Sequence, residues 1–78
     1  MGLSDQDIAA AIVDLARHRG AEKTVCPSDV ARALAEEWRP LMPEIRRIAK
    51  TLPQIRATQR GVEVDPVTAK GPIRLGLR

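Results

Sequence analysis

The spacing of apolar residues changes at Pro53, and this change divides the chain into a helical part and a strand-forming part. Before Pro53, apolar residues recur three and four positions apart, which is typical of amphipathic helices. After Pro53, apolar and polar residues alternate, which is typical of half-buried strands. The 78 residues have room for one domain, because a half of about 40 residues does not bury a core of its own. We therefore expect a single domain over residues 1–78.

Three helices are predicted before Pro53, at residues 4–19, 27–36 and 39–52. Apolar residues line one face of each, and basic residues line the opposite face of the third. The third helix has two possible starts, because the prolines at 40 and 43 are tolerated only in or near the first turn. It begins either near residue 39 or, one turn shorter, at Pro43. Both readings keep its apolar and basic faces.

Capping residues mark the ends of the first two helices. Ser4 is placed to accept a hydrogen bond from the first turn, and Gly20 to end the first helix. Pro27 suits the first turn of the second helix, so Cys26 is predicted as its N-cap. A reactive thiol at Cys26 is the alternative, but catalysis needs a base, and the only histidine lies on another helix.

The residues after Pro53 predict a small antiparallel hairpin. Residues 55–59 and 62–64 alternate between apolar and polar, and Arg60 and Gly61 form the turn between them. A further strand is predicted at residues 72–75.

The order of these elements predicts a mainly α fold with a small β wing, that is, a winged helix-turn-helix of three helices plus a short antiparallel hairpin. A stub of strand is expected at residues 24 and 25, between the first two helices. The chain has no Phe and no Tyr, so the core is aliphatic, and Trp38 is expected to cover it as a lid. The alternatives are a plain three-helix bundle with a frayed tail, and Trp38 as an exposed platform for bases.

Five short runs stand out as a set: CPSDVAR at residues 26–32, WR at 38–39, LMP at 41–43, VDP at 64–66 and GPIRL at 71–75. Together they resemble a family of small bacterial winged-helix domains whose function is not established. The resemblance covers nearly the whole chain, and it is specific, because no local propensity requires CPSDVAR and GPIRL together. It implies the winged-helix fold and brings no activity with it.

The positive charge of the protein lies in the second half of the chain. Residues 1–38 contain four basic and seven acidic side chains, whereas residues 39–78 contain nine basic and three acidic ones. A lopsided field of this kind favours polyanionic partners. The alternative is that the clustered charge serves solubility alone.

Basic residues of the third helix and the wing are the candidate nucleic-acid contacts. In helix-turn-helix proteins the second helix of the motif enters the major groove, while flanking cations contact phosphates. We expect these cations to form one contiguous ridge facing solvent, and we predict binding to duplex DNA, as a transcriptional regulator or accessory factor. The predicted contacts are Arg39, Arg46, Arg47 and Lys50 on the helix, with Arg56, Arg60, Lys70 and Arg74 in and beside the wing.

The alternative function is a protein-interaction module that uses the same basic surface or an apolar patch near Leu41 and Met42. A protein partner or a homodimer is also expected if the protein regulates transcription, because one domain reads one half-site. No catalytic motif or set of metal ligands is present, so we predict a non-enzymatic domain without cofactor, metal or small-molecule substrate. No apolar run approaches the length of a membrane span. The single cysteine and the lack of a secretory signal favour the cytoplasm.

Overall fold

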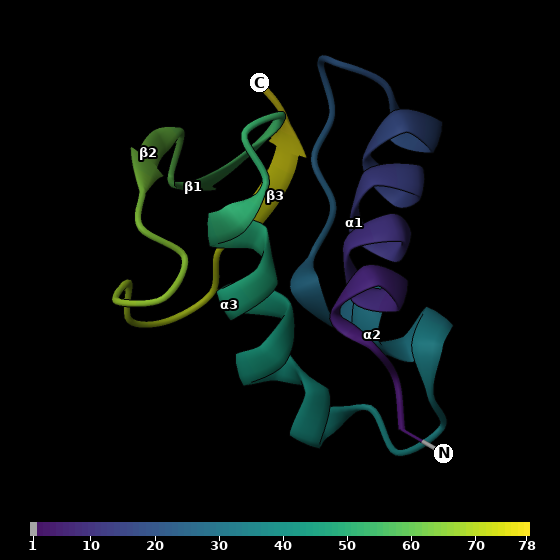
Figure 1. Ribbon diagram of the computed structural model, residues 1–78. Coiled ribbons are helices and arrows are strands. Elements are labelled where there is room, and N and C mark those ends of the chain that lie inside the picture. Colours follow the sequence, from purple (N-terminus) through teal and green to yellow (C-terminus); the bar gives the residue numbers. More distant parts are fainter. Residues whose placement is uncertain (1) are drawn as a thin grey trace.

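Figure 1 shows the computed structural model, which describes residues 2–78. Three helices are followed by a three-stranded antiparallel sheet of order β2-β1-β3. The elements are α1 (Asp5–Arg19), α2 (Pro27–Leu34), the one-turn 3₁₀ helix η1 (Arg39–Leu41), α3 (Met42–Thr51), β1 (Ile55–Gln59), β2 (Val62–Val64) and β3 (Arg74–Leu77). This is the winged helix-turn-helix architecture predicted from the sequence, mainly α with a small β wing.

The first two helices begin where the capping residues predicted. Ser4 Oγ accepts a hydrogen bond from the N–H of Asp7 at 3.1 Å, and the Asp7 carboxylate accepts one from the N–H of Ser4 at 3.0 Å. This reciprocal pair satisfies two backbone donors that a helix start otherwise leaves free. Cys26 is the N-cap of α2, and its N–H donates to the Asp29 carboxylate at 3.4 Å. The second helix ends at Leu34, two residues earlier than predicted.

The third helix is not continuous over residues 39–52 as predicted, because η1 precedes α3. Pro43 has no N–H to donate to the carbonyl of Arg39, and its ring crowds that carbonyl. The chain therefore makes a tighter 3₁₀ turn, in which the N–H of Leu41 donates to the carbonyl of Trp38 at 3.0 Å. The α-helix begins at Met42, close to the alternative start at Pro43.

The sheet has one more paired strand than a simple hairpin. Strands β1 and β2 have the predicted bounds, and β3 pairs with the other edge of β1, so that Ala57 lies opposite Leu75. Strand β3 begins two residues later than predicted, and Pro72, which cannot donate to a ladder, lies outside it. Val25 forms the predicted stub: it exchanges two backbone hydrogen bonds with Leu75, at 2.7 and 2.8 Å.

The core is aliphatic and lies where all these elements meet. Its most deeply buried large side chains come from α1, the stub, α2, α3 and β3; they are Ile12, Val25, Val30, Ile45 and Leu75. Because the sheet contributes to this core, the alternative of a helical bundle with a frayed tail is wrong. Trp38 is half-buried against the core, as predicted for a lid. Within residues 2–78, no helix is both long enough and apolar enough to cross a membrane.

Candidate nucleic-acid interface

The wing, defined here as residues 55–73, consists of the β1–β2 hairpin and the loop that runs back beside α3 to β3 (Figure 1). Arg60 and Gly61 form the two-residue turn of the hairpin, with φ angles of +53° and +82°. Positive φ at both positions is what a type I′ turn requires, and glycine or asparagine usually occupies the first of them. The turn therefore holds Arg60 in a strained backbone conformation, with its side chain exposed at the tip of the hairpin.

Arg46 of α3 holds the wing loop against the helix. Its Nη1 donates to the carbonyl oxygens of Ala69, at 2.8 Å, and Pro66, at 3.4 Å, and its Nη2 donates to that of Gly71 at 2.7 Å. The side chain is half-buried, so the prediction that Arg46 faces solvent was wrong. The loop has carbonyl groups that no strand partner satisfies, and a planar guanidinium reaches several of them at once.

Two further contacts fix the same loop. Lys50 Nζ lies 2.6 Å from Asp65 Oδ2, and the Asp65 carboxylate also accepts a hydrogen bond from the N–H of Val67 at 2.8 Å. The hydrogen bond from Lys50, followed by that from the Val67 backbone, lowers the pKa of Asp65. On the other side, Gln59 Nε2 donates to the carbonyl of Lys70 at 2.6 Å. The wing is thus a braced element rather than a free flap.

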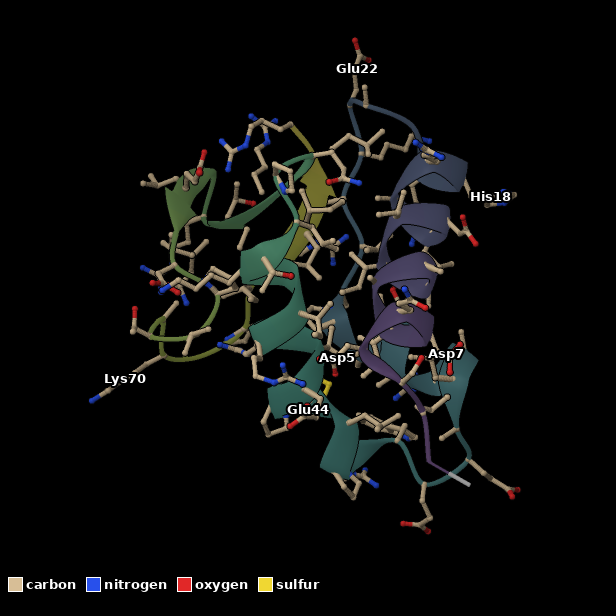
Figure 2. The ribbon with its side chains drawn as sticks, in the orientation of Figure 1. Asp5, Asp7, His18, Glu22, Glu44 and Lys70 are labelled. Carbon is tan, nitrogen blue, oxygen red and sulfur yellow. The ribbon has the colours of Figure 1, made fainter. Side chains whose placement is uncertain are left out.

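Arg47 is paired with carboxylates on both sides. Its Nη2 lies 2.9 Å from Asp5 Oδ1 at the start of α1, and it also contacts the Glu44 carboxylate one turn earlier on α3. Figure 2 shows Asp5 and Glu44 close together beside α3. The hydrogen bond from Arg47 lowers the pKa of Asp5. All three cations of α3 are therefore engaged within the protein, and the predicted free ridge does not form there.

Arg74 and Arg39 also have partners inside the molecule. The Arg74 guanidinium donates to Thr24 Oγ1 at 2.8 Å, to the Thr24 carbonyl at 3.0 Å and to Cys26 Sγ at 2.8 Å, which ties β3 to the strand stub. The Arg39 guanidinium lies over the indole of Trp38, 4.7 Å from the ring centroid.

Arg56, Arg60 and Lys70, named here the wing cations, differ from the other predicted contacts. Their side chains are exposed, and within the described part of the chain none makes a hydrogen bond, an ion pair or a contact with the Trp38 ring. Arg60 and Lys70 are among the residues that line one hollow of about 500 Å³, although they are ten positions apart. Figure 2 shows Lys70 pointing away from the body of the protein. Arg56 lies near Glu63, whose carboxylate is held by Arg78 at 3.0 and 2.8 Å.

Leu41 and Met42, where an apolar patch is the alternative, are half-buried and pack against the core. Within residues 2–78 the large apolar side chains that are exposed are Leu3, Val62 and Val67, and the last two belong to the wing.

Sequence reasoning missed the position of Arg32, whose guanidinium also lies over the Trp38 ring, 4.7 Å from the centroid. The two residues are six positions apart and belong to no common helix face. The only available signal was that basic residues precede and follow the single aromatic residue.

The fold and these contacts define a winged-helix domain. The cations of α3 are paired within the protein, Arg39 and Arg74 contact other side chains, and the wing cations have no such partner within residues 2–78. The chain belongs to the family described as "Protein of unknown function (DUF3253)", whose model matches residues 5–78 and so covers every helix and strand. The comparison with curated proteins gives no match.

Proposed function

We propose that this protein binds duplex nucleic acid through phosphate contacts made by the wing cations, Arg56, Arg60 and Lys70. The observation that carries the proposal is that Arg60 and Lys70 line one hollow and are exposed, and no carboxylate pairs with either within residues 2–78. An exposed cation without an internal partner binds a phosphate without first breaking an ion pair, and it gains from the release of the counterions of the nucleic acid.

The contacts of α3 favour the wing over the helix as the binding element. For Arg47 or Lys50 to reach a groove, they would have to leave Asp5, Glu44 or Asp65. Contacts to phosphates position a protein on a duplex without reading its bases. We therefore propose binding with little sequence preference.

The bracing of the wing supports the same proposal. Arg46 and Gln59 hold the loop that leads from the hairpin to Pro72, so Lys70 is attached to ordered backbone. Order that exists before binding lowers the entropy lost on binding.

The test is the salt dependence of binding to a short labelled duplex, followed by fluorescence anisotropy. Three phosphate contacts predict that the logarithm of the affinity falls with the logarithm of the salt concentration with a slope of about −2.7. This corresponds to about 40-fold weaker binding on going from about 50 to 200 mM salt. The variants Arg60→Asn and Lys70→Gln should each reduce the size of the slope by about one.

Arg19→Gln is the matched control, because it removes one exposed arginine from the last turn of α1. It should leave the slope unchanged. The proposal fails if no binding occurs at low salt, which would favour the protein-interaction alternative. It also fails if the slope is near −7, because about eight contacts would mean that the cations of α3 take part.

A further inference from the structure

Trp38 and two arginines form a cation–π cluster at the junction of α2 and η1, outside the wing. Arg32 comes from α2 and Arg39 from η1, and each guanidinium carbon lies 4.7 Å from the centroid of the indole. The indole itself is half-buried and packs against the core. The indole therefore attaches the cluster to the core.

The hydrogen-bond donors of both guanidinium groups are available to a ligand. A cation–π contact with an aromatic ring is not a conventional hydrogen bond, so it does not take up the N–H donors of a guanidinium as an ion pair would. Within residues 2–78, neither Arg32 nor Arg39 donates a side-chain hydrogen bond or forms an ion pair, although Glu36 and Glu37 lie between them in the sequence. Both arginine side chains are exposed.

We propose that Arg32 and Arg39, held on Trp38, form a phosphate-binding site. The planar guanidinium matches the oxygens of a phosphate group, and the contact with the indole reduces the side-chain freedom lost when the phosphate binds. The inference goes beyond the proposed function, because it uses none of the wing cations. The phosphate belongs either to a nucleic-acid backbone or to a small phosphorylated molecule, and the recognising chemistry is the same.

Glu36 and Glu37 oppose this binding without preventing it. Both carboxylates are exposed, and their interaction with a bound phosphate is weakened by water and by salt. Replacing both by glutamine should therefore tighten phosphate binding, and more so at low salt than at high salt.

Trp38 provides the readout, since it is the only aromatic residue and all intrinsic indole emission comes from this cluster. The full chain is titrated with inorganic phosphate at constant ionic strength, with chloride as the reference anion, and calorimetry provides a second measurement. We expect a saturable change in Trp38 emission with phosphate and none with chloride. Arg32→Gln and Arg39→Gln should each weaken phosphate binding about tenfold or more, because each removes a charged hydrogen-bond donor.

Three controls accompany the titration. Arg19→Gln removes the same charge from the C-terminal end of α1, which lies far from the start of α3 (Figure 1). It should leave phosphate binding unchanged. The double variant Arg60→Asn with Lys70→Gln removes two of the three wing cations and should keep the phosphate response, which separates this site from the wing. Arg39→Lys keeps the positive charge but replaces the planar guanidinium by an ammonium group. Thermal melts of every variant test whether the fold is retained.

A second arm of the experiment identifies the source of the phosphate. If a short duplex changes Trp38 emission in the wing double variant, the site takes a nucleic-acid backbone; if only inorganic phosphate or a mononucleotide does so, it takes a small phosphorylated molecule. Both results support the proposed phosphate-binding site. The inference is overturned if neither emission nor calorimetry detects phosphate binding, or if Arg39→Gln binds phosphate as tightly as the unaltered protein.

Discussion

Replacing Arg46 by alanine tests whether this side chain braces the wing. The variant loses three hydrogen bonds from a guanidinium to backbone carbonyls, two of them half-buried and one exposed. A hydrogen bond to a charged group contributes about 1.5–3 kcal/mol when it is well shielded, and less where water competes. Allowing for that exposure, we expect the free energy of unfolding to fall by about 2–3 kcal/mol, and the Tm to fall by about 10–20 °C for a domain of this size.

The assay combines thermal unfolding, followed by circular dichroism, with amide hydrogen exchange. The N–H of Ala69 donates to the carbonyl of Asp65 within the braced loop, at 2.9 Å, so its exchange should become faster when Arg46 is removed. Lys70→Ala is the matched control: this side chain is exposed and donates no hydrogen bond within residues 2–78, so its effect should stay within about 0.5 kcal/mol.

Arg46→Lys refines the test, because an ammonium group keeps the charge but cannot reach three carbonyls in the planar manner of a guanidinium. Its stability should lie between those of the unaltered protein and Arg46→Ala. The reasoning is refuted if Arg46→Ala melts no lower than Lys70→Ala and the Ala69 amide keeps its protection.

Three further predictions concern the turn, the Lys50–Asp65 pair and the third strand. Arg60→Asn should stabilise the protein by about 0.5–1 kcal/mol, because asparagine tolerates the positive φ of the type I′ turn, and it should also weaken duplex binding; a lower Tm would contradict this. Folding lowers the pKa of Asp65 from 3.8, so its contribution to stability is present above that pH and is lost as the pH falls through the lowered pKa. The free energy of unfolding of Asp65→Asn should therefore depend less on pH in this acid range. An unchanged pH profile would count against the Lys50–Asp65 pair. Gly76→Ala should cost about 1–2 kcal/mol in urea unfolding, because its Cβ would lie 3.2 Å from Thr24 Cγ2 and 3.4 Å from the Lys23 carbonyl, and a neutral result would show that the stub adjusts.

The elements of the fold could be predicted from the sequence because local chemistry determines them. Ser4 and Gly20 define the ends of α1, and the alternation on either side of Arg60 and Gly61 defines the hairpin. The start of α3 depended on two nearby prolines, and the sequence alone left both readings open. Each of these features rests on residues a few positions apart, which is the range over which sequence patterns are informative.

Whether each cation is paired or free could not be predicted, because its partners lie far away in the sequence. Asp5 is 42 positions from Arg47, and the carbonyls that bind Arg46 are 20 to 25 positions from it. The charge pattern correctly located the basic residues in the second half of the chain. It could not show which of them the fold would pair, and the backbone carbonyls of the wing loop carry no signature in the sequence at all.

The most direct test of the proposed wing interface is a titration of isotope-labelled protein with a short duplex, followed by backbone amide chemical shifts at low and moderate salt. We predict that the largest shifts lie at residues 56–61 and 70–72, that they shrink as salt is added, and that amides around Arg47 and Lys50 change little. Shifts concentrated in Met42–Thr51, or no shifts at low salt, would contradict the proposal that the wing makes the contact.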